Sequence, residues 1–121
     1  MWSLYRGPGV NATMDVKHLS DFLGFSAEKL QKHNLFQSER FFLDVYCVAP
    51  GQAQKPHRHA TSDKVYVVLE GQCRFRIGAE EAPHGPGAAV FAPAGVEHGV
   101  TNDGPGNARL LVLMTPPPEH A

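Results

Sequence analysis

The sequence predicts an all-β protein, a closed or nearly closed antiparallel barrel of about seven short strands in a single domain. Three observations lead to this prediction. From Arg40 onward the apolar residues recur with a period of two, as they do in strands. The 12 glycines and 10 prolines are concentrated after residue 50, where they divide the chain into short segments. The length of 121 residues is enough for one hydrophobic core.

The first strand is predicted over residues 41–48, where apolar side chains alternate in position and Pro50-Gly51 ends the run. A hairpin follows, because residues 64–69 and 73–77 are both rich in strand-forming residues and are joined by a short turn at Glu70-Gly71. The remaining strands are predicted over residues 88–92, 98–101 and 109–114, with glycine and proline turns between them.

Residues 1–39 are expected to form an N-terminal segment of the same domain, and residues 40–121 the barrel. Two short helices are predicted in this segment, because apolar residues recur at helical spacing on either side of Gly24. Ser26 precedes the second run and suits a helix N-cap. The residues at helical spacing are Val16, Leu19, Phe22 and Leu23, followed by Ala27, Leu30 and Leu35.

Charge and hydropathy argue against two classes of partner. Lysine and arginine number 11 against 12 acidic residues, so no basic field is present to bind nucleic acid. No apolar run approaches the length of a membrane span, and the first residues lack the apolar stretch of a secretory signal. We therefore expect a cytoplasmic protein that binds neither nucleic acid nor membrane.

Three histidines suggest a metal site. His57 and His59 are separated by one residue, so both imidazoles project to the same face of an extended strand. His98 follows the turn at Pro93-Ala94-Gly95, which places it at the start of another strand. The pair alone is also compatible with exposed strand histidines. Only an inward-facing pair, joined by a third ligand, would form a facial metal site.

The residues around these histidines resemble the two conserved motifs of the cupin superfamily, over about residues 40 to 115. The first comprises Gly51, five residues, His57-Arg58-His59 and then Gly71. The second is complete: Gly87, five residues, Pro93-Ala94-Gly95, two residues, His98, three residues and Asn102.

The resemblance implies a jelly-roll-like antiparallel barrel with a ligand site inside. It also implies that His57, His59 and His98 bind a divalent transition metal (Fe, Ni, Mn or Zn), and that the protein is a homodimer. The function expected from it is metal-dependent chemistry of the dioxygenase type on a small molecule. Two alternatives are a barrel that binds a metabolite or sugar without turnover, and a barrel that has lost its metal.

Lys64 stands where the family pattern has a fourth, glutamate ligand. An ammonium about 6 Å from a divalent ion is repelled by on the order of 5 kcal/mol at an effective dielectric of 20. Lys64 is therefore expected to turn toward Asp44 or Asp63, to lose its proton on burial, or to serve as the counter-charge of an anionic substrate. A bulge that brings Asp63 inward as a carboxylate ligand is a further alternative. Lys64 and Tyr66 share one strand face and are the candidate catalytic residues.

Overall fold

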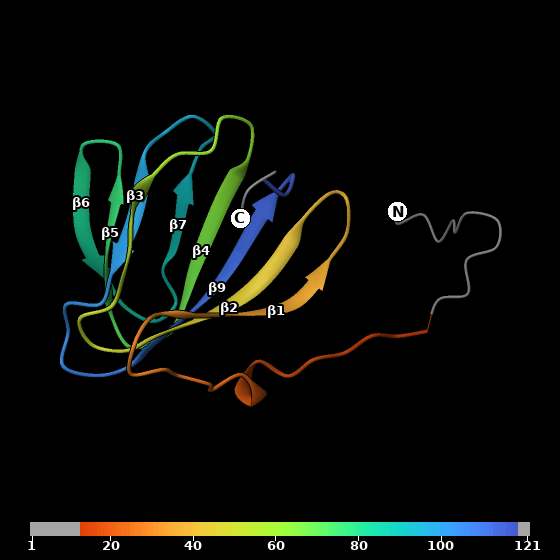
Figure 1. Cartoon of the computed structure of the whole chain (residues 1–121), viewed down its shortest axis with the longest axis horizontal. Coiled ribbons are helices and arrows are strands. Elements are labelled where there is room, and N and C mark those ends of the chain that lie inside the picture. Colours follow the sequence, from red (N-terminus) through yellow and green to blue (C-terminus); the bar gives the residue numbers. More distant parts are fainter. Residues whose placement is uncertain (1–12, 119–121) are drawn as a thin grey trace.

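The computed structural model describes residues 13–118, in which nine strands form two antiparallel sheets (Figure 1). The first sheet has five strands in the order β1-β2-β9-β4-β7, and the second has four in the order β3-β8-β5-β6. The predicted all-β, antiparallel, jelly-roll-like fold is confirmed. The strands are β1 Gln31–Gln37, β2 Phe42–Val48, β3 Ala53–His57, β4 Asp63–Glu70, β5 Cys73–Ile77, β6 Glu80–His84, β7 Ala89–Ala92, β8 His98–Thr101 and β9 Ala108–Thr115.

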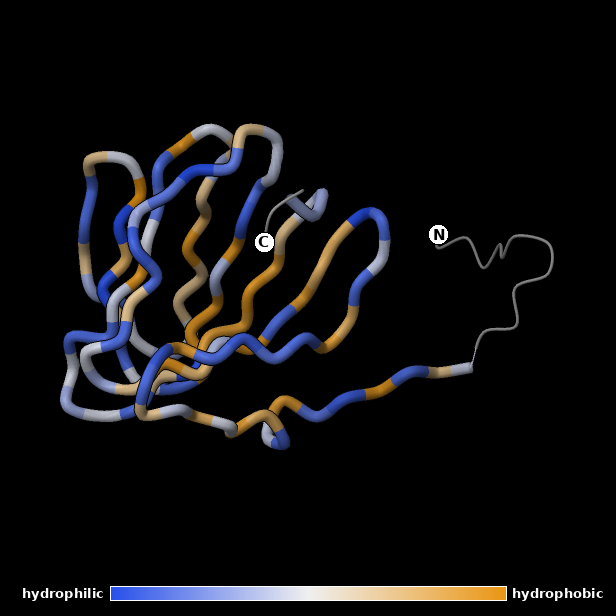
Figure 2. Tube along the Cα trace, in the orientation of Figure 1, coloured by the Kyte–Doolittle hydropathy of each residue, from blue (hydrophilic) through white to orange (hydrophobic). Residues whose placement is uncertain are grey.

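The core lies between the sheets and is built by alternation along their strands. In β4 and β9 every second residue is buried, so each strand gives one face to the core. The most hydrophobic stretches follow the strands of the five-stranded sheet, whereas β3 and β6 are largely polar (Figure 2). The main cluster includes Tyr46, Tyr66, Val68, Phe75, Val100, Leu110 and Val112.

The two predicted N-terminal helices are wrong. Among the described residues the first is reduced to a single 3-10 turn, η1, at Leu19–Asp21, and most of the second is replaced by β1. Ser26 Oγ does accept a hydrogen bond from the Glu28 N–H at 3.1 Å, but the bond closes a local turn and no helix follows it. Strand β1 pairs with β2, which satisfies its backbone groups, whereas a helix this short gains little by itself.

The segment before β1 covers part of the outer face of the five-stranded sheet. Phe22 and Phe25 pack there against Leu35, Val45 and Cys47, so their spacing reflects a second small core and not a helix face. Strand β1 is itself part of the sheet, which therefore begins before residue 40. Residues 1–12 of the predicted N-terminal segment lie outside the described residues.

Two residues of the cupin-like motifs have clear structural roles. Gly71 has φ +73°, and a Cβ there would lie 2.3 Å from the carbonyl oxygen of Asn107, so only glycine fits. The side chain of Asn102 is fully buried and donates to the carbonyl oxygens of Val48 and Gly106. It thereby joins β2 to the loop that leads into β9. No helix in residues 13–118 is long and apolar enough to cross a membrane.

Candidate metal centre

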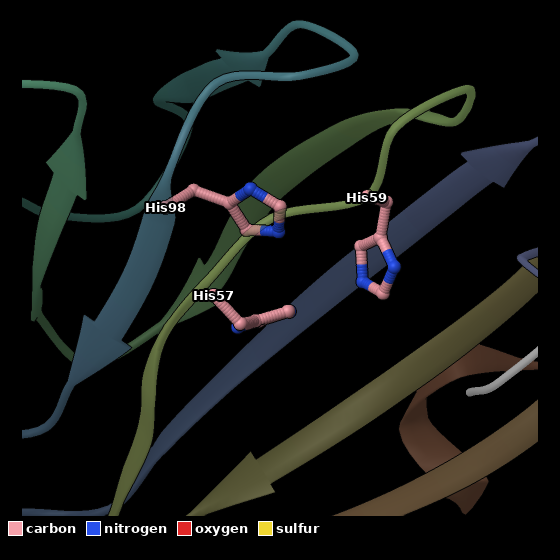
Figure 3. Close-up of side chains that lie close together, drawn as sticks. All are labelled: His57, His59 and His98. Atoms are coloured by element: carbon pink, nitrogen blue, oxygen red, sulfur yellow. The ribbon is translucent and has the colours of Figure 1, made fainter.

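The three histidines converge as predicted (Figure 3). His57 ends β3 and His98 begins β8, and the two are direct partners in the antiparallel pairing of these strands. His59 follows two residues after His57 and turns its ring toward the same point. The potential ligand nitrogens of the three side chains all lie within 4.8 Å of one another. The histidine triad is thus positioned to hold a metal ion.

Backbone carbonyls fix the orientation of two of the rings. His57 Nδ1 lies 2.8 Å from the carbonyl oxygen of Lys55, and His98 Nδ1 lies 3.0 Å from that of Val96. A carbonyl only accepts hydrogen bonds, so each Nδ1 carries the proton and each Nε2 presents a lone pair. His98 Nε2 is buried and has no hydrogen-bond partner within the described residues. A metal ion would satisfy this nitrogen.

The electrostatic setting keeps the imidazoles neutral. Burial lowers the pKa of His57 and of His59, and it lowers the pKa of His98 to about 4. The nearby Lys64 charge acts in the same direction on all three. Because a metal binds the neutral imidazole, near neutral pH the triad has the protonation state that binding requires.

Lys64 faces inward from β4 and is almost completely buried, at 1% exposure. Its amine donates a 2.8 Å hydrogen bond to Gln54 Oε1 and lies 5.3 and 4.9 Å from the ring centroids of Tyr46 and Tyr66. Burial, and next the charge of Lys32, lower the pKa of Lys64 to about 7. Within residues 13–118 Lys64 forms no ion pair with an acid, and its lowered pKa means that the buried amine is only partly protonated near neutral pH.

Neither Asp63 nor Tyr66 belongs to the cluster of potential metal ligands within the described residues. Asp63 Oδ1 accepts a 2.9 Å hydrogen bond from the Ala94 N–H, and Asp63 is not a member of the ligand cluster found within the described residues. Tyr66 is fully buried in the main core, its ring centroid 6.5 Å from that of His98. Burial raises the pKa of its hydroxyl, which has no hydrogen-bond partner in the described part of the chain.

A cavity of about 880 Å³ opens beside the triad. His57 and His59 line it together with Lys64 and Tyr46. Sequence reasoning missed Lys32 and Gln54, which also line it. Lys32 falls within the second predicted helix, whereas in the structure it lies on β1 and pairs with Tyr46. The other polar residues lining the cavity include Asn34, Gln37, Asp44, Arg58, Thr61 and Ser62.

Residues 44–114 match the cupin domain family, and the chain therefore belongs to the cupins. It is similar to the crystal structure of TT1209 from Thermus thermophilus, with 50% identity and a TM-score of 0.84, covering 87% of this chain and 100% of that one. It is also similar to an RmlC-like cupin from Desulfovibrio desulfuricans, with 27% identity and a TM-score of 0.76, covering 87% and 99% of the two chains.

A curated relative is the tetracenomycin polyketide synthase protein TcmJ of Streptomyces glaucescens. It is 32% identical over 75 residues, which cover 62% of this chain and 50% of that protein. The match thus spans about half the length of the Streptomyces protein.

Proposed function

We propose that the protein is a metal-binding cupin in which His57, His59 and His98 hold one divalent transition metal ion beside a cavity for a small organic molecule. The observation that carries this proposal is the pair of Nδ1 contacts to backbone carbonyls, which direct the Nε2 lone pairs of His57 and His98 away from the backbone. The unpartnered, buried Nε2 of His98 supports it independently.

The donor set suits several ions and leaves room for a ligand. Imidazole is a good donor for Fe, Ni, Mn and Zn, so the identity of the metal follows from availability as much as from the site. Three protein ligands leave coordination positions open. A bound ion would supply Lewis-acid or redox chemistry there. The chain itself supplies neutral imidazoles, a buried amine at Lys64 and the side-chain amide of Gln54.

We propose oxidoreductase chemistry of the dioxygenase type as the reaction, with binding without turnover as the second candidate. The cavity at the triad favours the first, since a reactant has access to His57 and His59. Lys64 favours binding without turnover, because it stands where the family pattern has a carboxylate ligand to the metal. The Streptomyces relative is a polyketide synthase protein, which supports an organic molecule as the ligand in either case.

Anaerobic loading with Fe(II), followed by oxygen uptake across a panel of small organic acids, phenols and diketones, separates the two candidates. Uptake that depends on both Fe(II) and one panel member is the expected result for the enzyme. Binding of that member by calorimetry, with oxygen consumption equal to that of the metal-loaded protein alone, would establish binding without turnover. A protein that takes up no metal would overturn both.

We further propose that the protein forms a homodimer through the outer face of the five-stranded sheet. A row of apolar residues crosses this face, since Phe91 pairs with Val65, Val65 with Leu113, and Leu113 with Leu43. Phe91 is 54% exposed, and Val65, Leu113 and Leu43 are half-buried, so the row presents apolar surface of the kind that is typical of an interface. Light scattering is expected to give twice the mass of one chain. The mass of a single chain would contradict the dimer.

A further inference from the structure

Two lysines from distant parts of the chain lie near the same aromatic ring in the cavity. Lys32 on β1 and Lys64 on β4 place their amines 5.4 and 5.3 Å from the ring centroid of Tyr46. Both line the cavity that opens at the histidine triad. Burial is the largest cause of the lowered pKa of Lys64, the charge of Lys32 is the next, and the charge of Asp44 acts in the opposite direction.

The Lys64 amine is short of acceptors. An ammonium has three donors, and the hydrogen bond to Gln54 Oε1 uses one. The faces of Tyr46 and Tyr66 offer only cation–π contacts to the others. A buried charge with this few partners is costly, and an anion between the two amines would supply the missing acceptors.

The charges around the cavity also favour an anion. Lys32, Arg58 and Lys64 line it, against a single acidic residue, Asp44. Within residues 13–118 none of these three basic residues forms an ion pair, and Asp44 accepts a hydrogen bond from Asn34 at 2.9 Å. A divalent ion at the triad would add to the positive excess.

We propose that the cavity binds a small organic carboxylate, with its carboxylate group held between the amines of Lys32 and Lys64 beside the Tyr46 ring and the rest of the molecule directed toward the histidine triad. Binding of the carboxylate group by the two lysines does not depend on a bound metal. Only the orientation of the rest of the molecule toward the triad rests on the proposed metal-binding function.

Calorimetric titration of the metal-free protein below pH 7 tests the proposal. The probes are malonate, succinate, glutarate and adipate, each paired with its uncharged diamide. We expect at least one dicarboxylate to bind at least tenfold more tightly than its diamide. Zinc loading should raise that affinity. If no dicarboxylate binds, or if each diamide binds as well as its acid, the proposal is overturned.

Variants assign the binding to the two amines. Lys64→Met and Lys32→Met should each weaken dicarboxylate binding at least tenfold, whereas the exposed Lys29→Met should leave it unchanged. Lys32 is exposed, so its variant remains decisive even if Lys64→Met fails to fold. Unchanged affinity in Lys32→Met would contradict the proposal.

Zinc titration of the same samples distinguishes the carboxylate site from the metal site. Zinc binding without dicarboxylate binding would overturn only the carboxylate site, and dicarboxylate binding without zinc binding would overturn only the metal site.

Discussion

The hydrogen bond from the Lys64 amine to Gln54 Oε1 joins the two sheets, since Lys64 lies on β4 of the five-stranded sheet and Gln54 on β3 of the other. Strand β3 also carries His57. The residue that replaces the family's glutamate ligand is therefore connected, through one neighbouring side chain, to the strand that presents the triad. Substitutions of Lys64 therefore test two properties, the stability of the metal-free protein and the affinity of the triad for metal.

Lys64→Met should stabilise the metal-free protein, and the gain should depend on pH. In the unfolded chain Lys64 keeps its proton up to its ordinary pKa of 10.5, whereas in the folded protein its pKa is about 7. Between these values the unfolded chain binds more protons, so the Lys64 contribution makes the free energy of unfolding rise with pH across this window. At pH 6 the cost of burying the charge is fully present, on the order of 5 kcal/mol at most.

Urea unfolding of wild type and Lys64→Met at several pH values measures this cost. The variant should be the more stable protein at pH 6, and its advantage should shrink as the pH rises from 7 to 10. A constant difference across this range would show that the amine of the folded protein does not titrate near pH 7.

Lys64→Glu should tighten metal binding at least tenfold, about 1.4 kcal/mol, because it removes a repelling ammonium and restores the fourth ligand of the family pattern. Zinc titration of wild type and variant in one buffer is the measurement, with Lys29→Glu as the control for a change in net charge. The same substitution closes an open coordination position, so any oxygen uptake should fall as the affinity rises. Equal zinc affinities would show that Lys64 has no influence on the triad.

Gly71→Ala should destabilise the protein by more than Gly51→Ala. Both glycines have positive φ, so each substitution costs on the order of 1 kcal/mol in backbone strain. Only at Gly71 does the added Cβ meet backbone, at 2.3 Å from the Asn107 oxygen, whereas nothing lies within 4 Å at Gly51. Thermal unfolding of the two variants should therefore differ clearly. Equal losses would mean that the loop before β9 shifts to accommodate the methyl group.

The sequence predicted those strands in which apolar and polar residues alternate, because in them every second side chain is buried. Strand β9, from Ala108 to Thr115, alternates buried and half-buried residues along most of its length, and β4 does the same. The histidine triad was predictable for a similar reason. The two-residue spacing predicted His57 and His59 on one side, and His59 does turn its ring toward the same point although β3 ends at His57. The turn before His98 brings it opposite His57.

The parts that sequence did not predict depend on pairing between distant residues. Strand β6, Glu80–His84, is exposed at every position, so it has no alternation to detect and exists because it pairs with β5. Strand β1 begins inside the run of Ala27, Leu30 and Leu35 whose spacing predicted a helix, and it is a strand because β2 supplies its hydrogen bonds. Consequently the position of Lys32 beside Tyr46, which governs the charge of the cavity, was out of reach of local patterns.

The stoichiometry of bound metal tests the central claim most directly. Metal-free wild type, His98→Ala and the control His84→Ala, whose histidine is exposed on β6, are loaded with Co(II), desalted and analysed for metal and for far-UV circular dichroism. Wild type and His84→Ala should retain one ion per chain, and His98→Ala should retain none while keeping its strand signal, because the sheets position the other ligands without it. Full occupancy in a folded His98→Ala protein would contradict the three-histidine metal centre.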